Sequence, residues 1–157
     1  MEKFPITKDG FDKLTRELRY CKTVERPDII RAIVEARAHG DLSENAEYTA
    51  AKEKQSFIEA RIANLQRIAN LAEVIDTAAL NGDIVQFGAY VTLLDYDNDE
   101  EIIYQIVGEY EADIRQKRLS ILAPLALALI SKKIGEIVEV EIPKGSKVYE
   151  ILNIEYR

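Results

Sequence analysis

The most constraining feature of the sequence is a repeat of alternately four and three residues that runs through residues 44–72. Such a spacing keeps one narrow face on a helix and is typical of a coiled coil. A narrow seam of this kind needs a second helix to cover it, so the segment predicts a long helix packed lengthwise on a partner. The seam positions are Glu44, Tyr48, Ala51, Gln55, Ile58, Ile62, Leu65, Ala69 and Ala72.

The partner helix is predicted in the residues that precede the repeat. Pro27 interrupts this run, which predicts a bend or a helix restart near residues 25–28. Gly40 suits the left-handed conformation that commonly ends a helix, so residues 38–41 remain for a turn between two antiparallel helices. At about 1.5 Å per residue, about thirty residues carry the tip of this hairpin about 45 Å from its base. The apolar face is formed by Phe11, Leu14, Leu18, Cys21, Ile29, Ile30, Ile33 and Val34.

The second half of the chain changes from a helical to a strand period. Residues 81–109 indicate two strands joined by an acidic turn, and residues 136–142 and 148–156 alternate apolar with polar side chains. Pro124 opens a short apolar segment that fits one helix, since proline is tolerated in a first turn. The sequence therefore predicts an α+β fold with two domains: a coiled-coil hairpin over 1–75 and a small antiparallel-sheet domain with one short helix over 80–157.

Composition narrows the functional classes. The chain has 157 residues, 47% of them apolar, and a formal net charge of −7 that lies entirely in residues 76–157. A sequence-independent nucleic-acid binder would need excess lysine and arginine to neutralise phosphates, so any role on DNA or RNA is expected to be indirect. No apolar run approaches the about 20 residues of a membrane span, and the start lacks the apolar core of a signal peptide. A cytoplasmic protein without a membrane partner is expected.

The predicted bend is crowded with acidic residues. Asp41 and Glu44 lie three residues apart, which fits a capping box at the start of the second helix. The alternative interpretation is that a rigid arm presents these carboxylates to a partner. Because Mg²⁺ in proteins usually takes one or two carboxylates together with waters and phosphates, the rest of such a site would come from that partner.

The motif "GDLSENAEY" (residues 40–48) resembles the tip of the bacterial transcript cleavage factors of the GreA/GreB family. The similarity is collinear over nearly the whole chain, with "RPDIIRAIVEARAHGDLSENAEYTAAKEKQ" in the hairpin, "FGAYVTLLDYDNDEEIIYQIVGEYEADI" in the second half and "GEIVEVEIPKGSKVYEILNIEYR" at the end. The resemblance implies a coiled coil that enters the secondary channel of RNA polymerase and an FKBP-like second domain that docks on the channel rim.

The resemblance also implies roles for the tip acids. Asp41 and Glu44 are expected to help hold the second Mg²⁺ and its attacking water beside the polymerase's own aspartates. The polymerase would then cut backtracked nascent RNA near its 3′ end, and arrested complexes would resume elongation. On this interpretation the chain is an accessory factor and not an enzyme. It would have no cofactor of its own, and the isolated protein would hold no metal.

Several further residues fall within or beside the matched motif. Ser43, Asn45 and Tyr48 are expected to support the tip, although Tyr48 also occupies a seam position. Arg37 and Lys52 resemble the family's basic patch toward the emerging RNA, and the alternative is that both are only solvated side chains on a helix face.

The short helix of the second half departs from the family pattern. The resemblance places a polymerase contact at Pro124 and Leu125, but the family often has a basic residue and a glycine where this chain has Leu127 and Ser131. An exposed Leu127 would extend an apolar docking patch instead.

Two other functional classes remain open at this point. The chain could be a regulator that occupies the polymerase pore without promoting cleavage, although the intact "GDLSENAEY" argues against that. It could also be a peptide isomerase or chaperone that uses the FKBP-like fold. A fold does not imply an activity, and the second half lacks the rich aromatic pocket that a proline-binding site needs.

Overall fold

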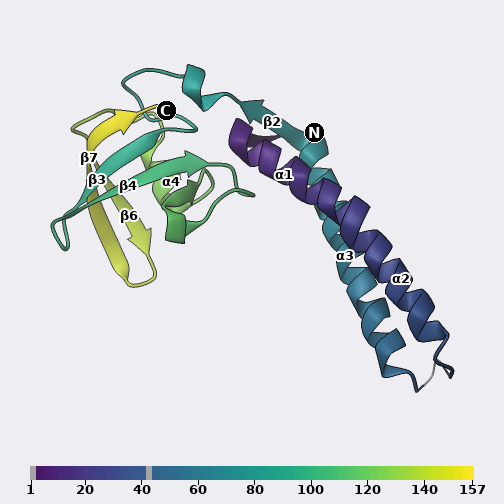
Figure 1. The fold of residues 1–157 in the computed structure, drawn as a ribbon. Helices are drawn as coiled ribbons and strands as arrows, with labels where there is room; N and C mark the ends of the chain where they lie inside the picture. The colour runs from purple at the N-terminus through teal and green to yellow at the C-terminus, as the bar shows by residue number, and fades with distance from the viewer. Residues whose placement is uncertain (1–2, 42–43) are drawn as a thin grey trace. The chain divides into compact units, whose positions relative to one another are not determined.

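The computed structural model describes residues 3–41 and 44–157, and the chain divides into two units. One unit is Phe11–Leu71, and the other joins Met1–Gly10 to Ala72–Arg157 (Figure 1). This division differs from the predicted ranges 1–75 and 80–157 because strand β1 (Phe4–Thr7) pairs in parallel with strand β2 (Ala72–Ile75). The α+β fold with a helical hairpin and a sheet domain is confirmed.

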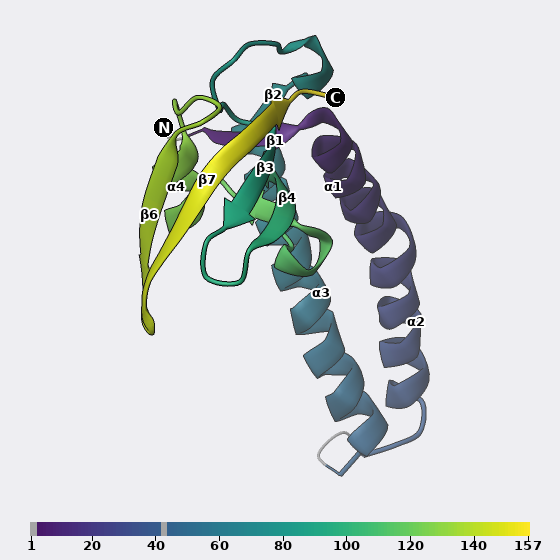
Figure 2. The same ribbon diagram turned by 90° about the vertical axis from the view of Figure 1, so that its left-hand side faces the viewer.

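The hairpin unit is built from helices that lie side by side in both ribbon views (Figures 1 and 2). Helix α1 spans Lys8–Tyr20, α2 spans Arg26–Arg37 and α3 spans Ala46–Leu71. The predicted seam is largely confirmed, with Ile68 rather than Ala69 buried near the base. Its buried side chains are Leu14, Leu18, Cys21, Ile29, Ala36, Ala51, Ile58, Ile62, Leu65 and Ile68.

The irregularity expected near residues 25–28 lies one turn earlier and does not break the helix. Cys21–Glu25 form a π-helical turn, in which the N–H of Arg26 donates to the carbonyl of Cys21. Pro27 then falls in the first turn of α2, a position at which proline is tolerated. The helical path therefore continues from α1 into α2.

The prediction that Ile30 and Val34 continue the apolar face is wrong. After the π turn the buried positions of α2 are Ile29 and Ala36, whereas Ile30 is 46% and Val34 is 62% exposed. The buried face of α2 is therefore narrower than the apolar residues of the sequence suggest, because only Ile29 and Ala36 of this helix are fully buried.

The second unit is a five-stranded sheet in the order β5–β4–β3–β7–β6, with helix α4 (Pro124–Leu129) packed against its core. The strands are β3 (Tyr90–Asp95), β4 (Glu100–Val107), β5 (Arg118–Ser120), β6 (Ile137–Ile142) and β7 (Gly145–Glu155). Short 3₁₀ turns occur at Thr77–Ala79 and Ile114–Gln116. The prediction of an antiparallel sheet holds for three strand pairs and is wrong for the edge pair β4–β5, which is parallel.

Ser131 adopts the left-handed conformation, with φ of 70°, directly after α4. This is the position at which the family pattern favours glycine, and a left-handed residue with a Cβ atom costs about 1–2 kcal/mol. Its backbone is held in place because the N–H of Ser131 donates to the carbonyl of Val85 at 2.8 Å. The departure from the family pattern therefore leaves the turn intact and strains one residue.

We expect Ser131→Gly to raise the free energy of unfolding by about 0.5–1 kcal/mol, since relief of the left-handed strain exceeds the entropy that glycine adds to the unfolded chain. Urea unfolding measures the difference. Ser131→Ala is the matched control and should give no increase, because alanine keeps the Cβ atom. Equal stability of the glycine and alanine variants would contradict the strain.

A partly buried ion pair joins the end of β3 to the beginning of β7. Asp95 is 1% exposed, and its carboxylate lies 2.7 Å from Nζ of Lys147 and accepts the N–H of Asp97 at 2.9 Å. The hydrogen bond from Lys147 lowers the pKa of Asp95 below its ordinary value and raises the pKa of Lys147. The stability contributed by Asp95 is therefore present above the ordinary carboxyl pKa and is lost as the pH falls through the lowered value.

Lys147→Met is expected to lower the free energy of unfolding by about 2 kcal/mol at pH 7, because a buried carboxylate loses its cation while the apolar stem is kept. The gap between variant and wild type should narrow as the pH falls, because burial without the cation raises the pKa of Asp95 in the variant and its carboxyl becomes protonated at a higher pH than in the wild type. Urea titrations from pH 7 to pH 3 test this. A gap that stays constant over that range would show that the charge pair is not the cause.

None of the helices within the described ranges is long and apolar enough to cross a membrane.

Candidate functional site

The tip of the hairpin begins where α2 ends. The N–H groups of Ala38 and His39 donate back to carbonyls of the last helical turn, at 3.2 Å to Glu35 and 3.1 Å to Ala36. Gly40 follows with φ of +119°, a value that L side chains rarely adopt. The positive φ predicted for Gly40 is confirmed, but α2 itself ends three residues earlier, at Arg37.

Asn45, and not Asp41, holds the N-cap of α3. Its Oδ1 accepts the N–H of Tyr48 at 3.0 Å, while its Nδ2 donates to the carbonyl of Ala36 at 2.6 Å. One amide thus caps α3 and ties it to the last turn of α2. The capping-box interpretation of Asp41 and Glu44 is wrong, because α3 begins only at Ala46. The sequence motif placed Asn45 only in the supporting tip; the strong preference of asparagine for N-cap positions is the signal that could have identified this role.

The connection between the helices is accordingly longer than the predicted turn at 38–41, since it extends from Ala38 to Asn45. Ser43, which the sequence places in the supporting tip, lies outside the described residues. Asp41 and Glu44 both lie in this connection, and both side chains are exposed.

The two predicted acids are brought to one place. Asp41 and Glu44 line a single open depression at the tip, together with His39, Asn45, Ala46 and Glu47. Glu47 is the third carboxylate around it and lies in the first turn of α3, where the helix dipole favours negative charge. The depression therefore concentrates negative charge at the end of the helical hairpin.

Across residues 3–41 and 44–157, no group of three or more His, Cys, Asp or Glu side chains is arranged to hold a metal ion. Exposed carboxylates are nevertheless the ligands that a hard cation such as Mg²⁺ accepts in small number. The donor set fits a cation whose other ligands come from a second molecule.

Tyr48 and the two basic residues flank the tip. Tyr48 is half-buried and lines a second open depression with Thr49, Lys52, Glu53 and Ser56. Lys52 is exposed and donates from Nζ to Gln55 at 3.1 Å, and Arg37 is the exposed last residue of α2. Their proposed role toward RNA stays a prediction.

Hydrogen bonds and ion pairs connect the helices of the hairpin below the tip. Arg26 binds Glu59 through two nitrogens, at 2.7 and 2.8 Å, and this bidentate bond lowers the pKa of Glu59. Lys22 donates to Gln66 at 2.9 Å, and Arg61 pairs with Glu17. These bonds join α3 to the helical segment that runs antiparallel to it, and as exposed pairs they supplement the packing of the buried seam.

The predicted docking residues lie at the start of α4. Pro124 is exposed, whereas Leu125 is half-buried and packs against the core of the sheet unit. Leu127 is 63% exposed, as expected for the departure from the family pattern, and Leu122 is 58% exposed. A polymerase contact through this helix stays a prediction.

Comparison with known protein families matches both units of the chain. Residues 4–83 match the family model described as transcription elongation factor, N-terminal, and residues 80–156 match the one described as transcription elongation factor, GreA/GreB, C-terminal. Together these two matches cover almost every described residue.

Curated relatives are similar over the full length. The chain is 59% identical over 155 residues to the transcription elongation factor GreA of Rickettsia felis, covering 99% of this chain and 96% of the relative. It is 56% identical over 156 residues to the protein of the same name from Acidiphilium cryptum, covering 99% of each.

Solved structures give more distant matches. The Gfh1 protein of Thermus thermophilus, a GreA factor homologue, is 24% identical with a TM-score of 0.46 and covers 98% of this chain and 99% of that one. The GreA/GreB elongation factor from Nitrosomonas europaea is 20% identical with a TM-score of 0.43 and covers 98% and 100%.

Proposed function

Because the chain belongs to the GreA/GreB family of transcription elongation factors along its whole length, we propose that it stimulates the RNA-cleavage activity of RNA polymerase. In this proposal the hairpin enters the secondary channel of the polymerase, and the tip reaches the catalytic centre. The polymerase cuts the backtracked nascent RNA near its 3′ end. The chain is an accessory factor that works in the cytoplasm and carries no cofactor of its own.

The observation that carries the proposal is the placement of Asp41 and Glu44. Both are exposed, and both line one depression beside Asn45, which supplies the cap of α3. Exposed carboxylates at such a place can be reached by a second molecule. Their place in the connection between two long helices is suited to a narrow pore, since only two packed helices need to enter it for the acids to reach its end.

The proposed chemistry divides the site between two proteins. Asp41 and Glu44 would supply oxygen ligands or water contacts to a Mg²⁺ ion that the polymerase aspartates hold incompletely. A second metal ion in such a site stabilises the attacking and leaving oxygens of phosphodiester hydrolysis. The contribution of this chain is negative charge at a defined position. That position depends on Asn45 and on the packing and ion pairs between the helices of the hairpin.

Incubation of the full chain with a stalled elongation complex that carries end-labelled RNA tests the proposal. With Mg²⁺ present, we expect short cleavage products and resumed elongation at a rate well above that of polymerase alone. Unchanged RNA together with slowed synthesis would instead indicate a factor that occupies the pore without promoting cleavage.

A further inference from the structure

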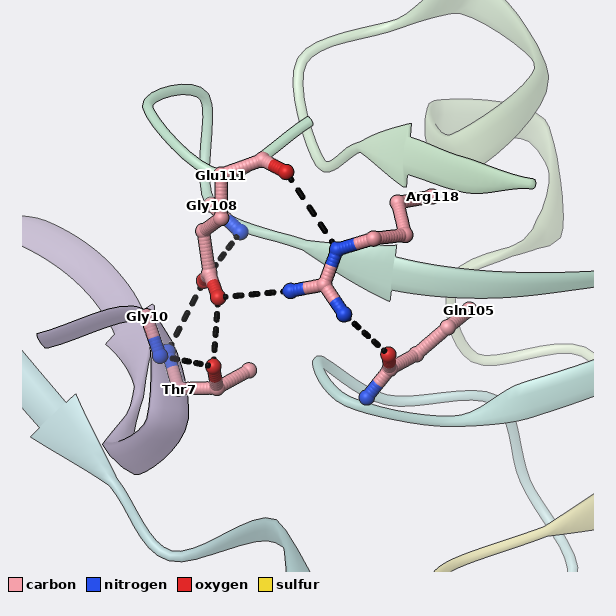
Figure 3. A network of polar contacts seen from close by, with 6 residues as sticks. All are labelled: Thr7, Gly10, Gln105, Gly108, Glu111 and Arg118. Carbon is pink, nitrogen blue, oxygen red and sulfur yellow. Dashed lines mark hydrogen bonds and ion pairs between the residues drawn. The ribbon is translucent and has the colours of Figure 1, made fainter. Parts of the chain in front are cut away.

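A buried carboxylate lies far along the sequence from the tip, where β4 leads into β5. The side chain of Glu111 is 4% exposed, and its oxygens accept four hydrogen bonds (Figure 3). The donors are the N–H of Thr7 at 2.8 Å, the hydroxyl of Thr7, the N–H of Gly108 at 2.9 Å and Nη2 of Arg118 at 3.0 Å. Four donors fill the acceptor capacity of a carboxylate.

Glu111 also orients the residue that begins the hairpin. The hydroxyl of Thr7 donates a hydrogen bond to Glu111 and accepts one from the N–H of Gly10 at 3.0 Å, which makes Thr7 the N-cap of α1. The carboxylate therefore fixes the rotamer of the capping side chain. This links the first turn of α1 to the segment between β4 and β5.

Two glycines allow the backbones to approach this carboxylate. A Cβ atom on Gly10 would lie 2.2 Å from Oε1 of Glu111, and one on Gly108 would lie 2.2 Å from the carbonyl oxygen of Pro5. Neither contact is sterically allowed for another residue without displacement. The cluster is thus close-packed against the backbone of β1.

Arg118 is held on the other side of the carboxylate. Its Nη1 donates to the buried Gln105 at 3.2 Å, and its Nε donates to the carbonyl of Glu111 at 3.3 Å. Charge-assisted bonds of this kind are stronger than neutral ones. The side chain of Glu111 is therefore held by Arg118, and it in turn holds the side chain and N–H of Thr7.

The position of Thr7 matters because the chain enters and leaves the hairpin through two paired strands. β1 directly precedes α1, β2 directly follows α3, and Thr7 lies opposite Ile75 in their parallel register. We propose that Glu111 is a positioning residue that anchors the root of the hairpin by binding Thr7. The inference rests on the proposed function, in which a tip at the far end of the arm must reach a fixed point.

Two pairs of variants isolate the anchor. Glu111→Gln places an NH₂ group against donors in either amide orientation, because each carboxylate oxygen accepts two hydrogen bonds. Glu109→Gln is its control, since Glu109 is exposed and its substitution removes the same charge. Thr7→Val removes the hydroxyl, and Thr7→Ser restores it.

The first measurement is hydrogen exchange of the Thr7 and Gly10 amides in the full chain. Loss of a hydrogen bond to a charged group predicts exchange at least about tenfold faster in Glu111→Gln and in Thr7→Val, and unchanged exchange in both controls. Unchanged exchange in Glu111→Gln and Thr7→Val would overturn the anchor. If Glu111→Gln does not fold, the Thr7 amide in the Thr7→Val and Thr7→Ser pair decides the result, because that amide donates to Glu111 and is not part of the cap.

The second measurement is the dependence of RNA cleavage on factor concentration with a stalled elongation complex. A loosened root lowers the fraction of molecules that are ready to bind, so the half-saturating concentration should rise about three- to tenfold with an unchanged maximal rate. A fall in maximal rate alone, or no change in either quantity, would overturn the positioning role. Failure of the wild-type chain to stimulate cleavage would instead refute the proposed function and leave the exchange result to judge the anchor.

Discussion

The double variant Asp41→Asn, Glu44→Gln is expected to lose cleavage stimulation by a factor of about 10² to 10³ while it still folds. The amides keep the size of the side chains but remove the charge that would attract the second metal ion, and preorganised charge in a water-excluded site is worth factors of that order. Because Asn45 supplies the cap of α3, the fold should lose less than about 1 kcal/mol. Single-turnover cleavage and urea unfolding measure the two quantities.

Glu47→Gln is the matched control for the tip acids. Glu47 lines the same depression but lies inside α3, so its charge can be removed at the same place without touching the predicted pair. We expect it to retain stimulation within about threefold of wild type, as for a surface charge near a helix end. The single variants at Asp41 and Glu44 should be partly rescued by raised Mg²⁺. A Glu47→Gln loss as deep as that of the double variant would show that only the total negative charge matters.

The second large effect is expected from Asn45→Ala. This change removes the cap of α3 and the bond to the carbonyl of Ala36, so the connection that carries Asp41 and Glu44 loses its tie to both helices. Misplacement of reacting groups by about 1 Å can cost about 10²-fold in rate, and we expect stimulation to fall by at least about tenfold. The free energy of unfolding should fall by about 1–2 kcal/mol.

Asn45→Asp separates the two bonds of the amide. Its carboxylate can still accept the N–H of Tyr48, but it cannot donate to the carbonyl of Ala36. We expect near wild-type helix content with an intermediate loss of stimulation. If both Asn45→Asp and Asn45→Ala stimulate RNA cleavage as well as the wild type does at saturating concentration, the hydrogen bond from Asn45 to Ala36 does not position the acids.

The hairpin was predictable from the sequence because its signal is local and repeated. The seam from Tyr48 to Leu65 is set by a spacing that each turn of α3 reinforces, and Gly40 marks the end of α2 by its backbone freedom. The alternation in β3 likewise follows from one buried face. The positions of Asp41 and Glu44 in one depression followed from their short separation in the sequence.

The features that the sequence did not predict depend on contacts between distant residues or on small energy differences. The pairing of β1 with β2 joins residues that are separated by the whole hairpin, and the bonds from Glu111 to Thr7 connect positions 104 residues apart. The three-residue strand β5 is too short to show a period. The π turn at Cys21–Glu25 changes only the hydrogen-bond register, and apolar residues such as Val34 give no sign that they face water.

The central claim is that the tip acids act on RNA cleavage and not on binding to the polymerase. A competition experiment tests it most directly: single-turnover cleavage in a stalled elongation complex is measured with wild-type chain and a rising excess of the folded double variant. The account predicts that the double variant alone leaves cleavage at the rate of polymerase without factor, and that its excess suppresses the wild-type stimulation. Cleavage by the double variant at a near wild-type rate would contradict the account.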